Sequence, residues 1–192
     1  VYNAEGYISV DLNGKRSLML AAGYLDYKYA QYNYSYLNNG VFIRAGMDFN
    51  LLSPDKALGK YWAGIGLSYG LSRFNSEVPV FIQTDYWGTK VYSISPKTDW
   101  GHFLEASPGV RAEIFNHFSI GWSISIRMLL YTTTGKDLRP IFFPGFGNGT
   151  KTFSTGLSYF FVWNIPYKKI KFIHKKEVKE EEIKEEKQEE VQ

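Results

Sequence analysis

The sequence contains no cysteine, and this absence excludes several kinds of site at once. A chain without thiols cannot form disulfides, zinc–thiolate sites or iron–sulfur clusters, and it has no cysteine nucleophile. Long apolar runs are also lacking. The longest covers about five residues, 159–163, whereas a transmembrane helix needs roughly 20. The sequence therefore excludes a helical membrane protein.

Charged side chains are scarce over most of the chain and concentrated at its end. Residues 1–166 carry 25 of them, about 15%, whereas about 25% is usual for soluble domains. Residues 167–192 carry eight Lys and eight Glu, and such a segment cannot bury a core. We expect a folded domain over 1–167 and a charged tail over 168–192 that is disordered or partly helical.

Aromatic residues are frequent, at 18% of the chain, and they recur where large apolar and small polar side chains alternate. This period of two is typical of strands that bury one face. It predicts strands over residues 5–12, 16–27, 40–50, 61–72, 102–115, 119–130 and 153–163. These segments are long for ordinary strands but suit tilted strands that cross a membrane.

The two faces of these strands differ in a way that favours a membrane environment. In the segment 61–72, Ile65 and Leu67 lie on one face, while Gly64 and Ser68 lie on the other. A soluble barrel of the lipocalin type would expose the second face to water, yet that face has almost no lysine. Glycine and serine suit the narrow lumen of an eight-stranded barrel. We predict an all-β fold, a small antiparallel up-and-down transmembrane β-barrel.

The connections between these strands alternate in length, as in outer-membrane barrels with short periplasmic turns and long external loops. Asn13-Gly14 and Asn116-His117 are short, whereas 28–39, 74–98 and 132–151 are long. On this pattern the segment 5–12 runs inward, and the charged tail lies in the periplasm. Seven strands are visible where eight are expected, so we expect an outward-running first strand to be missing before Val1.

Aromatic residues gather at the ends of the predicted strands, where membrane barrels carry girdles at the headgroup level. Tyr61 and Trp163 fall at periplasmic ends, and Tyr69 and Tyr131 fall at external ends. We predict that these four residues belong to the aromatic girdle. Outer-membrane lipid and lipopolysaccharide are the predicted partners of this surface.

Several stretches resemble the pattern of a known family. They are Asp85-Tyr86-Trp87-Gly88, Phe103-Leu104-Glu105-Ala106, Gly121-Trp122-Ser123-Ile124-Ser125-Ile126-Arg127 and Pro144-Gly145-Phe146. Over residues 4–168 the chain resembles an uncharacterised family of Bacteroidota outer-membrane β-barrel proteins. The resemblance implies an eight-stranded barrel with one strand before 4–12, and it assigns no reaction. Pro108 departs from the aliphatic residue of the family, and we expect a bulge or local break near 107–109.

Charged residues on the small-residue faces are expected to point into the lumen, where a buried charge must be paired. We predict an ion-pair network that fills the lumen, formed by Arg44, Asp48, Glu105, Arg111, Glu113 and Arg127, with Glu5 and Asp11 facing the same space. A gated ion path through these residues is an alternative. No cofactor and no metal site are predicted.

Two sites near the external rim are candidates for function. His102 lies there, with Asp99 and Ser95 close in sequence, and a lipid-modifying enzyme would need such a set in one geometry. Long loops are the other place where function concentrates. We predict an external loop surface formed by Tyr32, Tyr34, Tyr86, Trp87 and Phe146. Packing across the barrel mouth and recognition of a partner are the two roles expected for these residues.

These features favour a structural or interaction role in the bacterial outer membrane. We expect an accessory subunit or scaffold of a larger assembly or transport complex, with other outer-membrane proteins as partners. A lipid-modifying enzyme and a narrow pore are the alternatives. Nucleic-acid binding is not expected, because the basic stretch 168–176 suits anionic lipid instead.

Overall fold

The computed structural model describes residues 2–52, 61–134 and 140–165, which form antiparallel strands and no helix. Seven strands make one sheet in the order β1-β2-β3-β4-β5-β6-β9, so the all-β, up-and-down prediction is confirmed. Their bounds are β1 Tyr2–Asp11, β2 Arg16–Gln31, β3 Tyr34–Asn50, β4 Tyr61–Asp85, β5 Gly88–Phe115, β6 Phe118–Thr132 and β9 Phe153–Trp163. No helix in these three ranges has the length and apolarity to cross a membrane. The predicted charged tail lies outside the described residues.

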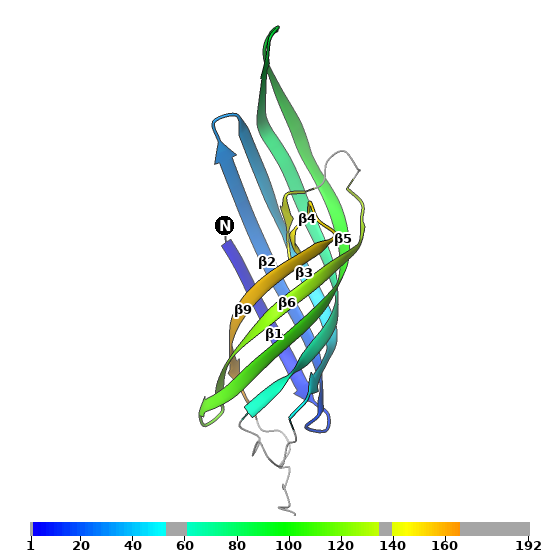
Figure 1. Ribbon diagram of the computed structural model, residues 1–192, viewed down its shortest axis with the longest axis vertical. Coiled ribbons are helices and arrows are strands. Elements are labelled where there is room, and N and C mark those ends of the chain that lie inside the picture. Colours follow the sequence, from blue (N-terminus) through cyan, green and yellow to red (C-terminus); the bar gives the residue numbers. More distant parts are fainter. Residues whose placement is uncertain (1, 53–60, 135–139, 166–192) are drawn as a thin grey trace, which may run out of the picture.

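The sheet curls around a central lumen and stays open along one seam (Figure 1). β1 and β9 are its two edges. Each is antiparallel to its single neighbour, β2 and β6 respectively, so both edges run in the same direction. The described residues therefore form an open half-barrel, and the eighth strand of the predicted barrel is not among them.

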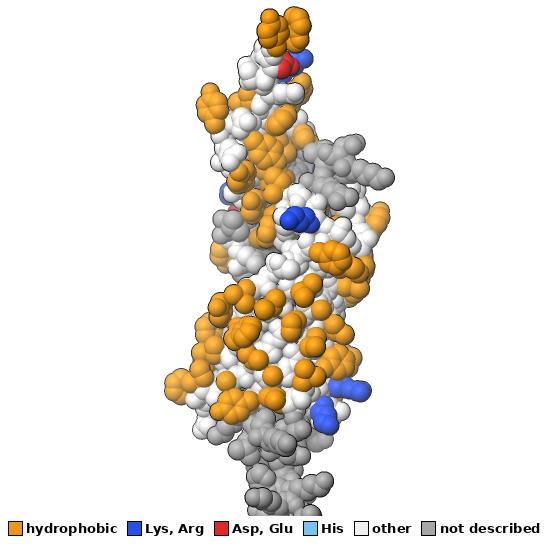
Figure 2. Space-filling view, in the orientation of Figure 1, with side chains coloured by type: hydrophobic (Ala, Val, Ile, Leu, Met, Phe, Trp, Pro, Cys, Tyr) orange, Lys and Arg blue, Asp and Glu red, His pale blue; other side chains and the backbone are white. Residues whose placement is uncertain are grey.

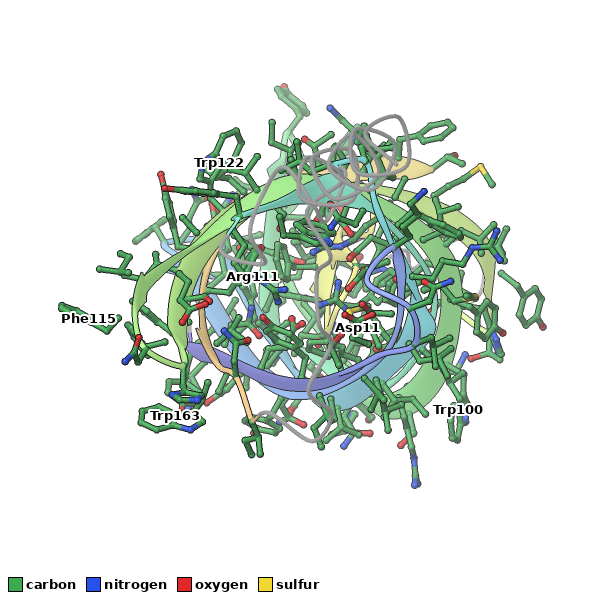
Figure 3. The ribbon with its side chains drawn as sticks, turned by 90° about the horizontal axis from the view of Figure 1, so that it is seen from below. Asp11, Trp100, Arg111, Phe115, Trp122 and Trp163 are labelled. Carbon is green, nitrogen blue, oxygen red and sulfur yellow. The ribbon has the colours of Figure 1, made fainter. Side chains whose placement is uncertain are left out.

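The alternation of side chains turns the sheet apolar outside and polar inside. Trp100, Trp122 and Trp163 point away from the lumen, whereas Arg111 and Asp11 point into it (Figure 3). On the surface, apolar side chains cover the lower half of the body, with Lys and Arg side chains at its lower margin (Figure 2). This exterior is the reverse of the one that a soluble barrel presents to water.

β4 and β5 extend far beyond their predicted ends as a hairpin that projects past the other strands (Figure 1). Tyr86 and Trp87 form its turn, in which the Trp87 N–H donates to Asp85 Oδ1 at 2.9 Å and Gly88 has a φ of 128°. The segment 28–39 is also strand, apart from a turn at 32–33. The long-loop predictions were wrong here, because backbone pairing continues where the side-chain alternation fades.

The predicted break at Pro108 is confirmed on one side of β5. Pairing with β4 runs through Ile65↔Pro108. Pairing with β6 stops at Ala106↔Ile126 and resumes in the same register at Gly109. Proline has no N–H to donate to a ladder. The strand therefore continues while the ladder to β6 is interrupted.

The segment between β6 and β9 folds back into the lumen. It contains two short paired strands, β7 Phe142–Phe143 and β8 Gly147–Asn148, and we call residues 142–148 the plug. Phe143 stacks on Phe74 with ring centres 5.1 Å apart, and on Phe146 at 4.8 Å. Phe103 completes this buried aromatic cluster. The apolar core of the described residues thus lies inside the upper lumen.

Candidate functional site: lumen and external rim

Two arginines and two glutamates form one ion-pair network in the lumen. Arg44 on β3 pairs with Glu105 on β5 and with Glu5 on β1, and the Arg127 Nε on β6 donates to Glu105 at 2.5 Å. The side chains of Arg44 and Glu105 are only 8% and 3% exposed. Buried charges are tolerated when they are paired and hydrogen-bonded. The four groups therefore tie β1, β3, β5 and β6 together across the lumen.

The strand register explains why these charges meet. Glu105 and Arg127 are direct cross-strand partners, so opposite charges face each other. Arg44 has Ala21 on one side and Gly70 on the other. A Cβ on Gly70 would lie 2.2 Å from the Phe103 ring. Small neighbours thus leave the space that a long arginine side chain needs in a narrow lumen.

A second polar layer lies nearer the short turns. Arg111 on β5 interacts electrostatically with Tyr7 on β1 and with Asp48 on β3. Its guanidinium carbon also lies 5.8 Å from the centre of the Trp62 ring. Arg111 thus points into the lumen (Figure 3), and Asp48 lies near it, four positions beyond Arg44 along β3.

Two other acidic residues expected in the lumen serve the short turns. Glu113 accepts a hydrogen bond from the His117 N–H at 3.0 Å, and His117 has a φ of 71°. Asp11 accepts from the N–H groups of Asn13 and Gly14 at 3.1 and 2.7 Å. Such side-chain bonds stabilise tight turns.

The plug closes the upper lumen and is anchored by hydrogen bonds. Arg127 Nη1 donates to the Phe146 carbonyl, and the Tyr36 hydroxyl donates to the Phe142 carbonyl, both at 3.4 Å. Phe146 is fully buried, so its predicted place on an external recognition surface was wrong. It packs across the barrel mouth because Gly145, with a φ of 74°, turns the chain inward.

Tyr36 lies above the expected membrane-crossing part of β3. Burial raises the pKa of Tyr36 to about 12, against the lowering effect of a hydrogen bond from Asn38. The Asn38 Nδ2 donates to the Tyr36 hydroxyl at 2.9 Å. This pair fastens the outer end of β3 to the plug.

The other predicted loop residues lie near the hairpin ends. Tyr32, Tyr86 and Trp87 are 98%, 92% and 88% exposed. Tyr34 instead packs against Phe81, with ring centres 6.2 Å apart. Of these predicted loop residues, the most exposed are therefore the three at the two hairpin tips.

The predicted girdle residues all lie on the outward face. Tyr61, Tyr69, Tyr131 and Trp163 are 59%, 45%, 60% and 72% exposed respectively. His102 shares this face. Its Nδ1 lies 2.5 Å from the Tyr69 hydroxyl, and its ring centre lies 6.1 Å from that of Tyr131.

His102 and Asp99 do not form a catalytic pair in this geometry. They are three positions apart on β5, so their side chains fall on opposite faces. Asp99 is buried and accepts a hydrogen bond from Thr133 Oγ1 at 3.0 Å. The parts of the chain that the structure describes hold no group of three or more His, Asp or Glu arranged to bind a metal.

The sequence did not predict one cluster of side chains near the external rim. Arg73 on β4 stacks on Trp100 on β5, and Thr98 Oγ1 donates to Asn75 Oδ1 at 2.6 Å. Arg73 and Trp100 flank the segment 74–98, which the sequence predicted as a loop, and Asn75 and Thr98 lie within it. If the segment 74–98 is taken as a β-hairpin, Arg73 falls opposite Trp100 and Asn75 falls opposite Thr98.

Comparison with protein families gives one match, to a family described as a domain of unknown function (DUF6048), over residues 7–170. The chain belongs to the DUF6048 family. No curated protein and no solved structure matches the chain. The matched range of this DUF6048 chain begins within β1 and includes every later strand, so the family covers the half-barrel from the middle of β1 onward, together with its plug.

Proposed function

We propose that this DUF6048 chain is a transmembrane β-barrel of the bacterial outer membrane, in Bacteroidota as the resemblance implies. In this proposal it serves as an accessory subunit or scaffold of a larger assembly or transport complex. The carrying observation is a lumen filled by buried ion pairs and an aromatic plug, inside a wall whose outward side chains are apolar. A filled lumen argues against a narrow pore, and the separation of His102 from Asp99 argues against the enzyme alternative.

The height of the apolar wall supports membrane insertion. Phe153 and Trp163 mark the two ends of the 11-residue strand β9. With a rise of about 3.3 Å per residue and a tilt of about 40°, their separation is roughly 25 Å along the barrel axis. That is the height of the apolar band of outer-membrane barrels. In this orientation the short turns and the charged tail face the periplasm.

Closure requires a further strand between β1 and β9. We propose that this strand runs opposite to both edges, which gives eight antiparallel strands. The Tyr7 and Phe160 rings already meet across the seam at 6.0 Å, edge to face. Lipid-exposed open edges do not occur within the hydrocarbon region, so insertion and closure belong to one proposal.

Recovery of partners tests the scaffold role. The full chain, cross-linked in its native host and extracted in mild detergent, should bring a defined outer-membrane protein with it. Tyr86→Ser with Trp87→Ser at the exposed hairpin tip should lower that recovery several-fold. Thr84→Ser with Thr89→Ser, on the same hairpin, is the matched control. Unchanged recovery with the tip variant would contradict docking through this hairpin, and isolation of the wild type alone would contradict the subunit role.

A further inference from the structure

The outward face carries an arginine just above the external girdle. In the sheet register Arg73 lies between Val41 on β3 and Trp100 on β5. Its guanidinium carbon lies 5.5 Å from the centre of the Trp100 ring, and such stacking favours one position of the charge. Within the described residues, no carboxylate forms an ion pair with Arg73.

Neutral hydrogen-bonding groups form the next row of the same face. Asn39, Asn75 and Thr98 are cross-strand neighbours on β3, β4 and β5. Because Thr98 donates to Asn75 Oδ1, the amide NH₂ of Asn75 is left to donate elsewhere. These three residues and Arg73 line an open hollow of about 260 Å³. A cation surrounded by neutral donors suits an anion with several oxygen atoms.

The hollow lies at the level of lipid headgroups in the proposed orientation. Tyr69, a girdle residue, precedes Arg73 by four positions on β4. This spacing corresponds to roughly 10 Å along the barrel axis for a tilted strand. Tyr24 shares the row of Val41 and Arg73, so aromatic side chains flank the arginine. Tyr and Trp side chains favour the boundary between lipid chains and headgroups.

We propose that Arg73, Asn39, Asn75 and Thr98 bind the phosphate-bearing headgroup of an outer-leaflet lipid, with Trp100 holding the guanidinium. This inference rests on the proposed membrane barrel. A guanidinium binds two phosphate oxygens at once, and the amides supply further donors.

Neighbouring carboxylates leave the site cationic. Asp26, on the row of Asn39, is paired with Lys28 at 3.4 Å. Glu77 is four positions beyond Arg73 on β4, roughly 13 Å along the strand. The ligand therefore meets one positive charge and its neutral donors, because Asp26 is paired with Lys28, Asp99 is buried on the other face of the sheet and Glu77 lies beyond the site.

Lipid-dependent stabilisation tests the site. The full chain is reconstituted in phosphatidylcholine vesicles that contain phosphorylated lipid A, dephosphorylated lipid A or neither, and its urea midpoint is measured. Phosphorylated lipid A should raise the midpoint. Arg73→Gln should raise the lipid concentration for half-maximal effect about tenfold, which corresponds to about 1.4 kcal/mol, the low end for a charged hydrogen bond. Arg16→Gln, an exposed arginine at the opposite rim, should behave as the wild type.

Each outcome supports or overturns a separate statement. Equal responses of wild type and Arg73→Gln, in vesicles that protect the strands from protease, overturn the headgroup site alone. Failure of the wild type to insert into any of the vesicles overturns the barrel proposal. Inorganic phosphate in solution is expected to leave the midpoint unchanged. If it stabilises the protein as phosphorylated lipid A does, the lipid source is overturned in favour of a soluble ligand.

Discussion

At the scale of single residues, Arg44 and Glu105 are the centre of the ion-pair network in the lumen, because each has two partners. Arg44 meets Glu105 and Glu5, while Glu105 also meets Arg127. Loss of Arg44 leaves Glu5 without its counter-charge and leaves Glu105 with Arg127 alone. The cost of that unpaired charge exceeds what the intact pair contributes to stability.

We expect Arg44→Met to lower the free energy of unfolding by about 3–5 kcal/mol, because Glu105 and Glu5 lose a common partner. Urea titration of the reconstituted protein measures this. Arg16→Met removes an exposed arginine and should change the stability by less than about 0.5 kcal/mol. Identical urea midpoints for Arg44→Met and the wild type would contradict a stabilising role of the buried ion-pair network.

Tyr36 predicts a pH dependence above the ordinary range of tyrosine. Its pKa rises to about 12 on folding because the phenol is buried, whereas an unfolded tyrosine titrates near 10. The raised pKa stabilises the fold by about 2–3 kcal/mol below pH 10, and this contribution disappears as the pH rises to about 12. Tyr36→Phe should flatten the fall of unfolding free energy over that window. Equal slopes for both proteins would contradict the assignment.

At the scale of elements, the plug depends on a backbone conformation that favours glycine. Gly145 has a φ of 74°, and a Cβ there would lie 2.6 Å from the Phe42 ring. We expect Gly145→Ala to destabilise the protein by about 1–3 kcal/mol through this strain and clash. The control is Gly6→Ala in β1, where a Cβ meets nothing within 4 Å. A urea midpoint that Gly145→Ala leaves unchanged would mean that the plug does not need this turn.

The sequence predicted the strands in which large and small side chains alternate. It did not predict the projecting hairpin or the place of Phe146, which depend on backbone pairing and on the path of the chain. The bounds of β9 match the prediction at both ends, because large apolar side chains occupy every second position from Phe153 to Trp163 except Thr155. The projecting hairpin was missed, because its pairing is a property of the backbone. Phe146 was misplaced because an aromatic residue in a loop suits either a partner or a lumen, and only the three-dimensional path separates the two.

The need to pair buried charges predicted which residues form the lumen site. The register of the strands determines which of them are direct partners. Charges on small-residue faces must be paired, and this placed Arg44, Glu105 and Arg127 together. That Glu105 lies opposite Arg127 depends on the β5–β6 alignment. Sequence alternation leaves that alignment open, because it fixes faces and not cross-strand partners.

At the scale of the whole molecule, disulfide cross-linking tests whether a further strand lies in the seam between β1 and β9. With a strand between the edges, their backbones stand about 10 Å apart, too far for a disulfide. Oxidation of the pair Ile8→Cys and Phe161→Cys should therefore give no cross-link. Ile8→Cys with Leu20→Cys, which face each other on β1 and β2, should cross-link readily. The chain has no native cysteine to interfere.

A high yield of the Ile8–Phe161 disulfide would contradict an intervening strand and favour direct contact of the two edges. The same test applies in vesicles and in detergent. Agreement between the two media would show that the seam has one arrangement in both.

The shared direction of β1 and β9 also dictates an order of events. Until the seam is filled, two rows of backbone N–H and C=O groups lack partners, and each would cost several kcal/mol in hydrocarbon. In water the same rows would recruit other chains. In the proposed membrane barrel, the seam must therefore close while the sheet enters the bilayer, so that insertion and closure form a single step.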